Sequence, residues 1–194
     1  MPFTWDETRA RYRDSKTGRF VKPEKVIALS EASIEETTTL AQRLAGKSAK
    51  EVDRALREEI KRETIRQYML GRGGENRMTP KDWGSVGGSV REQYKHLSGF
   101  IDDIPNLTEA EIASRISMYI GSAREGFEKG KLAAIKESGS FTEERWVLGT
   151  TGENCNDCKE LAAKGWVKIG TLGQVPGDGG TQCLTHCGCH IEYR

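Results

Sequence analysis

The stretch that decides the fold runs from Thr108 to Phe127 and reads TEAEIASRISMYIGSAREGF. Thr108 and Glu111 have the spacing of a capping box, in which the two side chains satisfy amide donors at the start of a helix. The stretch therefore predicts an amphipathic helix that packs one face against a core. Its apolar residues recur at helical spacing and trace one stripe: Ile112, Ile116, Tyr119, Ile120, Ala123 and Phe127.

Two more helix starts precede this stretch. Ser48 and Glu51 form a second capping box, and Thr79-Pro80 places proline at the first helical position, where its missing N–H costs nothing. The helical pattern extends from Pro23 to about Lys136, so we expect residues 23–137 to fold as a helical, bundle-like domain. Helix breakers separate its parts, and we interpret the second of them as a helix stop and loop: Gly46, Gly71-Arg72-Gly73-Gly74 and Ile104-Pro105-Asn106.

The composition limits the classes of function. The chain has 194 residues, of which 30 are Lys or Arg and 29 are Asp or Glu, giving a net charge of +1. This balance gives no support for nucleic-acid or membrane binding through bulk charge. No stretch approaches the roughly 18 apolar residues of a membrane helix, and the first residues lack a secretory signal pattern. We expect a reducing cytosol, where clustered cysteines more often bind metal than form disulfides.

Residues 1–22 form a basic, aromatic N-terminal arm. Its aromatic residues are Trp5, Tyr12 and Phe20, and Thr17-Gly18 interrupts its run of Arg and Lys. One interpretation is a solvated terminus. The other is an arm that becomes ordered on a partner protein, with the three aromatic residues as docking anchors.

The composition changes at Ser138-Gly139-Ser140, after which the helical period disappears. Turn residues dominate residues 138–194, and short apolar pieces at 146–148 and 166–169 read as strands. A module of this size is too small to be stable on apolar burial alone and needs a cross-link, such as a structural metal ion or disulfides. We expect Trp146 and Trp166 to pack against that cross-linked site.

All of the cysteines lie in this module. A C-x-x-C turn places two thiolates on one side of a loop, and a second group roughly 25 residues later can close a metal site. Zinc accepts tetrahedral sulfur, and its binding energy becomes folding energy. The pattern predicts a structural zinc knot in which the spacing leaves open which four residues bind, and whether His186 or His190 replaces a cysteine. The candidate metal ligands are Cys155, Cys158, Cys183, Cys187 and Cys189.

The sequence also bears on other kinds of chemistry besides a structural zinc site. Disulfide pairing or plain buried thiols are the main alternative. Redox chemistry at Cys155-x-x-Cys158 is disfavoured because no strand-to-helix thioredoxin context surrounds it. Catalytic zinc is disfavoured because no His-Glu-x-x-His or other general base accompanies the cysteines. Asp102 and Asp103 are adjacent and do not face one another in a helix. We therefore predict no catalytic residues and no enzyme activity.

The tail carries a resemblance to a known family. Its two segments are WVLGTTGENCNDCKELA (residues 146–162) and PGDGGTQCLTHCGCHIEYR (residues 176–194). They are similar to the C-terminal segment of tailed-phage minor head proteins, the Mu F-like head morphogenesis family. That pattern pairs a C-x-x-C and Leu-Ala with a Gly-Thr, a cysteine and a terminal Cys-x-Cys. Residues 78–84, 93–100 and 11–21 also resemble such proteins.

The resemblance implies a non-catalytic structural component of a tailed-phage virion, a minor head protein near the portal vertex or along the shell. It implies capsid or portal proteins as partners, several copies in an assembly, and a location in the virion head after assembly in the host cytoplasm. It implies no membrane contact.

The alternative is a nucleic-acid-binding zinc-ribbon protein, such as a phage regulator or a packaging accessory. The basic arm favours it, and the net charge of +1 disfavours it. Nucleic acid is therefore a secondary candidate partner.

Overall fold

The computed structural model describes residues 3–6, 11–150 and 153–194, with the backbone alone for residues 3–5, 11, 23, 24, 27, 31 and 33–38. This described chain is mainly helical with a small C-terminal sheet and a cluster of cysteines, which confirms the predicted fold class. The α-helices are α1 (Pro23–Leu44), α2 (Ala49–Arg72), α3 (Pro80–Asp103), α4 (Glu109–Gly121), α5 (Arg124–Ser138) and α6 (Asn156–Ala163). The strands are β1 (Phe3–Asp6), β2 (Arg11–Asp14), β3 (Glu143–Val147), β4 (Val167–Lys168) and β5 (His190–Tyr193), and the 3-10 helices are η1 (Glu75–Arg77), η2 (Ile104–Asn106) and η3 (Leu184–His186).

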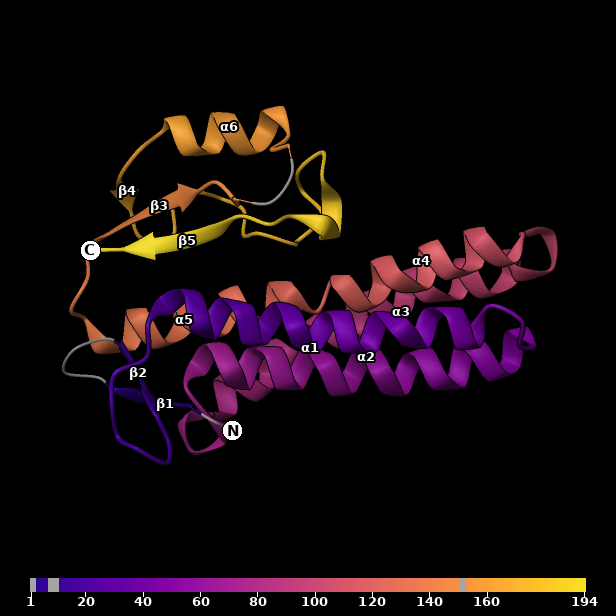
Figure 1. Ribbon diagram of the computed structural model, residues 1–194, viewed down its shortest axis with the longest axis horizontal. Helices are drawn as coiled ribbons and strands as arrows, with labels where there is room; N and C mark the ends of the chain where they lie inside the picture. The colour runs from indigo at the N-terminus through magenta and orange to yellow at the C-terminus, as the bar shows by residue number, and fades with distance from the viewer. Residues whose placement is uncertain (1–2, 7–10, 151–152) are drawn as a thin grey trace.

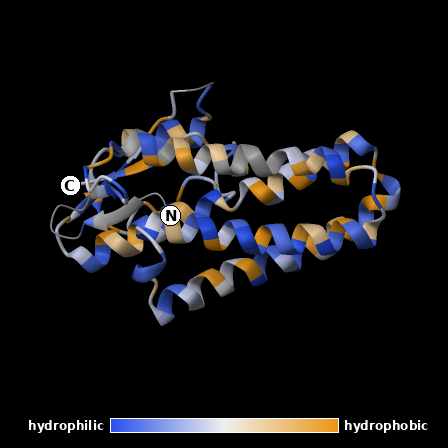
Figure 2. Cartoon of the chain, turned by 60° about the horizontal axis from the view of Figure 1, so that its bottom comes forward, coloured by the Kyte–Doolittle hydropathy of each residue, from blue (hydrophilic) through white to orange (hydrophobic). Residues whose placement is uncertain are grey.

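The helices α1 to α5 form an elongated body, and the C-terminal module of residues 138–194 lies over α5 (Figure 1). Figure 2 shows hydrophobic and hydrophilic residues mixed along each long helix, as expected where one face is buried. The largest apolar cluster joins α1, α2, α3 and α4, and it includes the fully buried Leu56, Leu97 and Ile116. None of the described helices is long and apolar enough to cross a membrane.

The predicted helix starts are confirmed by their caps. Ser48 with Glu51 and Thr108 with Glu111 form complete capping boxes at α2 and α4. The predicted signal at the start of α3 was the proline after Thr79. The structure adds a third capping box, formed by Thr79 and Asp82. Each box satisfies two of the amide donors that a helix start leaves without partners.

The interpretation of residues 71–74 as a helix stop and loop is wrong in its first half. Gly71 and Arg72 belong to α2, and the stop begins at Gly73, whose φ of 90° places it in the left-handed region. The amide of Gly74 then donates to the carbonyl of Met69, as in a Schellman ending. Gly71 is needed inside the helix for packing.

The predicted helix from Thr108 to Phe127 is broken in the structure. It divides into α4 and α5, and the joint is a tight turn in which Ala123 N–H donates to the Ile120 carbonyl. The apolar stripe continues through the joint, with Ile120 and Phe127 both buried. The break coincides with docking of the C-terminal module, since a Cβ at Gly121 would lie 3.4 Å from Thr185 Oγ1.

The helices α2 and α5 touch backbone to backbone. A Cβ at Gly71 would lie 2.0 Å from the carbonyl oxygen of Phe127, and one at Gly130 would lie 2.2 Å from that of Tyr68. Gly126 also lies close to α2, since a Cβ at this position would be 3.1 Å from the carbonyl oxygen of Thr64. Only glycine allows such an approach.

The described part of the N-terminal arm packs on the helical body. β1 and β2 pair antiparallel, with the backbone of Trp5 opposite Tyr12. Tyr12 is buried, and its hydroxyl donates to the Gly71 carbonyl at 2.6 Å. Val21 is buried in the same cluster as Phe127. The arm is therefore anchored in the fold at Tyr12 and Val21, and the loop of residues 15–19 between them is exposed.

The three predicted docking residues have different environments. The side chain of Tyr12 is buried in the fold and bonded to Gly71, so the prediction of Tyr12 as a docking anchor for a partner is corrected. Phe20 is partly buried, with the Arg13 guanidinium 3.8 Å above its ring. The side chain of Trp5 lies outside the described residues.

The C-terminal module is a three-stranded antiparallel sheet with the order β4-β3-β5, accompanied by α6 (Figure 1). The predicted strands at 146–148 and 166–169 overlap β3 and β4. The sequence did not predict α6, because a helix that begins at Asn156 and ends at Ala163 is too short to display a clear apolar period.

The glycine contact between α2 and α5 predicts opposite outcomes for two matched substitutions. Gly130→Ala should destabilise the fold by about 1–3 kcal/mol or more, because the helices must separate. Gly84→Ala, on α3 with open space around it, should stabilise by about 0.5–1 kcal/mol through helix propensity. Urea denaturation followed by circular dichroism measures both. Equal effects of the two variants would contradict the proposed close packing.

A buried ion pair joins the end of α2 to the start of α3. The Asp82 carboxylate accepts from Thr79 Oγ1 at 2.7 Å, Tyr68 Oη at 2.9 Å and Arg72 Nε at 3.0 Å. Arg72 also reaches Glu137 of α5 at 2.5 Å. Burial would raise the pKa of Asp82, but these hydrogen bonds outweigh it and lower the pKa to about 2.

This lowered pKa predicts how stability depends on pH. A carboxyl whose folded pKa lies below its ordinary value of 3.8 stabilises the fold above that value and loses the contribution as pH falls toward 2. The difference in unfolding free energy between the wild type and Asp82→Asn should therefore shrink between pH 4 and pH 2. Denaturant titrations across that range measure it, with the exposed Asp102→Asn as control. A constant difference would exclude this role for Asp82.

Candidate metal centre

Three short segments of the module bring the cysteines together. Cys155 is the N-cap of α6 and Cys158 lies in its first turn, which places both sulfurs at the same end of the helix. Cys183 precedes η3, and Cys187 and Cys189 lie between η3 and β5. The helix and the two loop segments thus meet at one point.

The sulfur atoms form two overlapping groups of three. Cys155, Cys158 and Cys183 make one group, and Cys158, Cys187 and Cys189 make the other, with all sulfurs of a group within 4.8 Å. The Cys158 sulfur lies 3.6 Å from those of Cys183 and Cys187, and 3.7 Å separates the sulfurs of Cys155 and Cys183. Zinc–sulfur bonds of about 2.3 Å place tetrahedral sulfurs about 3.8 Å apart. The observed sulfur–sulfur distances are close to this expected spacing, so the cluster could hold a metal ion.

The cysteines are thiols, and their burial favours a cation. All are free of disulfides, and Cys158, Cys187 and Cys189 are each 1% exposed. Burial raises the pKa of Cys158. The hydrogen bond from Cys187 to Cys189 raises the pKa of Cys187 and lowers that of Cys189 to about 5. Several adjacent thiolates are unfavourable without a positive charge, and a divalent ion removes that obstacle.

Polar contacts hold the cysteine segments in place. Asp157, inside the C-x-x-C sequence, accepts from the amide of Gln182 at 2.8 Å, beside Cys183. Asn154 donates to the Gly149 carbonyl at 3.1 Å. Gly149 itself lies against Gly188, where a Cβ would come within 2.6 Å of the Gly188 carbonyl oxygen. The two halves of the cluster are thus tied by the hydrogen bond between Asp157 and the Gln182 amide and by the backbone contact between Gly149 and Gly188.

An arginine of the helical body also reaches the cluster. Arg124, at the start of α5, is 7% exposed. Its two terminal nitrogens donate to the carbonyls of Cys187 at 2.7 Å and Cys189 at 2.9 Å. Arg124 was not among the predicted site residues, although the sequence carries a signal for it, because Arg124 continues the i+4 series of Ile112, Ile116 and Ile120. A charged residue in a buried stripe needs a partner.

The histidines lie outside the cluster. Neither sulfur group contains His186 or His190. His186 is exposed, and His190 lies 3.8 Å from Glu192. His96 is exposed on α3, 3.6 Å from Glu92. The donor set that the described residues bring together is therefore entirely sulfur.

The two tryptophans of the module differ. Trp146 is 2% exposed and packs in one apolar cluster with Cys158, Cys187 and Cys189, as predicted. The prediction for Trp166 is wrong, because this partly buried residue is not in that apolar cluster. The guanidinium groups of Arg145 and Arg194 lie 4.7 and 4.5 Å from the centre of its ring, at cation–π distance.

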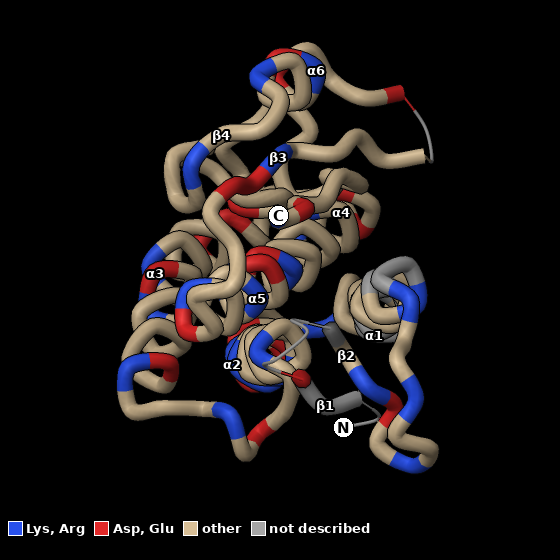
Figure 3. The backbone as a smooth tube through the Cα atoms, turned by 90° about the vertical axis from the view of Figure 1, so that its left-hand side faces the viewer, with Lys and Arg blue, Asp and Glu red and all other residues tan. Residues whose placement is uncertain are grey.

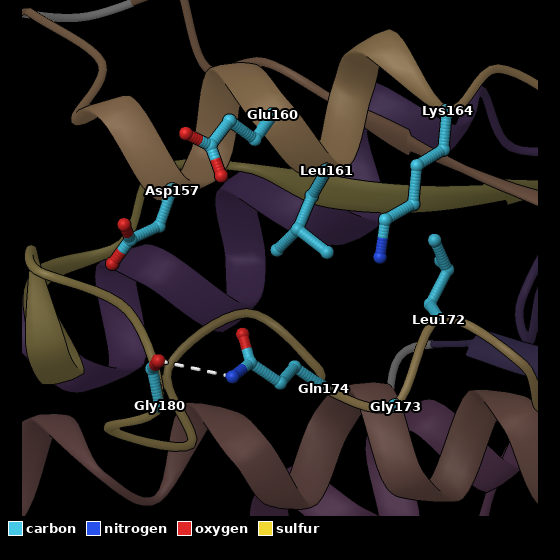
Figure 4. Close-up of a pocket in the computed structure, with 8 residues that line it drawn as sticks. All are labelled: Asp157, Glu160, Leu161, Lys164, Leu172, Gly173, Gln174 and Gly180. Carbon is cyan, nitrogen blue, oxygen red and sulfur yellow. Dashed lines mark hydrogen bonds between the residues drawn. The ribbon is translucent and has the colours of Figure 1, made fainter.

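A pocket of about 380 Å³ lies beside the cluster, between α6 and the loop that follows β4. Figure 4 shows its carboxylates on α6 and Gln174 below them, donating to the Gly180 carbonyl. One carboxylate, Asp157, already accepts the Gln182 amide. Among the described residues that line the pocket, no nucleophile lies beside a base. These residues are Asp157, Glu160, Leu161, Lys164, Leu172, Gly173, Gln174 and Gly180.

Comparison of the chain with protein-family models, with curated proteins and with solved structures finds no match.

Proposed function

We propose that the chain is a non-catalytic assembly component of a tailed-phage head, which acts through protein–protein contacts and whose C-terminal module is held by one structural zinc ion. The observation that supports the zinc ion is the convergence of all five cysteines in two overlapping groups whose sulfurs lie within 4.8 Å of one another, with 3.6–3.7 Å between the sulfurs of three pairs. The same segment carries the resemblance to minor head proteins.

An all-sulfur donor set favours a structural ion over a catalytic one. Catalytic zinc sites commonly include His or carboxylate ligands and an open position for water. Here Cys155, Cys158 and Cys183 supply three ligands, and the Cys187–Cys189 segment supplies the fourth. Zinc is preferred among thiolate-binding metals because the site needs only tetrahedral geometry and no redox change.

The balanced charge suits a protein that contacts other proteins. Figure 3 shows acidic and basic residues interspersed over the helices. This mixed distribution of charged residues along the chain disfavours a general affinity for polyanions. On this proposal the partners are capsid or portal proteins, several copies act in one head, and the location is the virion.

Nucleic-acid binding is the second candidate, and one observation favours it. The loop after β2 and the start of α1 expose four basic residues, Lys16, Arg19, Lys22 and Lys25. The module itself is slightly acidic, with five basic and seven acidic residues in 138–194. A gel shift that weakens steeply with salt would support this candidate over the head protein, and no shift at low salt would remove it.

The zinc proposal predicts the metal content. Protein purified without chelator should contain one zinc ion per chain by elemental analysis. Cys155→Ser should lose most of it and expose the module to protease, because metal binding supplies folding energy. His186→Ala, exposed and outside both sulfur groups, should retain the ion. Metal-free wild-type protein would refute the site, and full zinc in Cys155→Ser would exclude Cys155 as a ligand.

The assembly proposal predicts association with particles. The tagged chain, expressed with the phage head proteins, should co-sediment with purified heads at a constant ratio and resist a salt wash. Nuclease treatment should leave this association unchanged, because the contacts are with protein. Recovery only in the soluble lysate would argue against a virion role, and release by nuclease would favour the nucleic-acid candidate.

A further inference from the structure

Arg124 connects the helical body to the backbone of the cysteine cluster. Its side chain comes from α5, yet it donates to the carbonyls of two residues more than 60 positions later, Cys187 and Cys189. Carbonyls two residues apart in extended chain point the same way, and so do the side chains. A planar guanidinium fork holds such a pair in one geometry.

The segment that Arg124 holds is the one that must complete the site. On the proposed site, Cys155, Cys158 and Cys183, which form one of the two sulfur groups, supply three sulfurs, and a tetrahedral ion needs a fourth. Cys187 and Cys189 approach the first group through Cys158, from which the Cys187 sulfur is 3.6 Å away. The position of their backbone therefore sets whether a fourth sulfur reaches the ion.

Contacts on either side confine this segment. Gly188 is pressed against Gly149, and Lys131 donates to the carbonyl of Ile191. Three alternate carbonyls, of Cys187, Cys189 and Ile191, thus accept hydrogen bonds from basic residues of α5. Arg124 supplies two of these three bonds, at the residues that carry sulfur.

We propose that Arg124 is the positioning residue of the metal centre: it fixes the Cys187–Cys189 backbone so that the fourth thiolate reaches the ion. This inference rests on the proposed zinc site. It makes metal retention depend on the start of α5, at the joint where the helix from Thr108 is broken. Residues that orient metal ligands typically contribute 10–100-fold to metal affinity.

The test uses the full chain and the variants Arg124→Met and Arg124→Lys. Zinc affinity, measured by competition with a chromogenic chelator, should fall about 10–100-fold in Arg124→Met. Arg124→Lys, which can restore one of the two hydrogen bonds, should lie between this variant and the wild type. Arg62→Met, on the exposed face of α2, should bind zinc like the wild type.

Cobalt substitution separates positioning from general destabilisation. Co²⁺ in the wild type should give the intense charge-transfer and visible bands of four thiolates. Arg124→Met should give weaker charge-transfer absorption per cobalt, as water replaces the fourth sulfur. If Arg124→Met does not fold, the same comparison with Arg124→Lys decides.

Two results would overturn the inference in distinguishable ways. Wild-type affinity and an unchanged cobalt spectrum in both Arg124 variants would remove the positioning role and leave the zinc site intact. A wild-type chain that binds neither zinc nor cobalt would remove the zinc proposal itself and, with it, this inference.

Discussion

The close contact between α2 and α5 is the constraint on which the rest of the structure depends. Glycines at 71, 126 and 130 let the two backbones touch, and this places α5 against the C-terminal part of α2. The Gly71 carbonyl is then available at the end of α2, where the Tyr12 hydroxyl binds it and fixes the N-terminal hairpin. Arg72 follows, and its bonds to Asp82 and Glu137 join α2, α3 and α5.

Because α2 covers one side of α5, the opposite side determines how the C-terminal module attaches. That side carries Arg124, Glu128 and Lys131, all buried or partly buried. Buried charges are unfavourable unless they are paired or hydrogen-bonded. The two cations obtain their partners from the carbonyls of residues 187, 189 and 191, and Glu128 lies 4.0 Å from Lys131. These hydrogen bonds join the backbone of the module to α5, alongside the apolar contacts that Phe141, Ile169 and Tyr193 make with the body.

Much of the body could be predicted from the sequence, because capping boxes and apolar stripes are local signals. The glycines were misjudged for a physical reason. Gly71 is a breaker in an isolated helix, and only a neighbour at contact distance makes it a packing residue. Arg124 was missed because its partners lie in another segment, although its place in the stripe marked it as unusual. The cysteines were identified by spacing, but the fourth ligand depends on how the chain returns after η3, which spacing does not encode.

The proposed metal ion and the attachment of the module act on the same few residues. An ion held by cysteines within one loop would stiffen that loop alone. Here Cys187 and Cys189 present sulfur to the cluster and carbonyl oxygen to α5. If the ion is zinc as proposed, its loss would loosen the segment of residues 187–189, through which α5 binds the module. The reason is that the sulfur ligands and the carbonyl acceptors belong to the same residues. A partner surface made from both parts would then exist in one fixed geometry only while the ion is bound. On the proposed function, this property would suit a protein that fits an assembly of repeated copies.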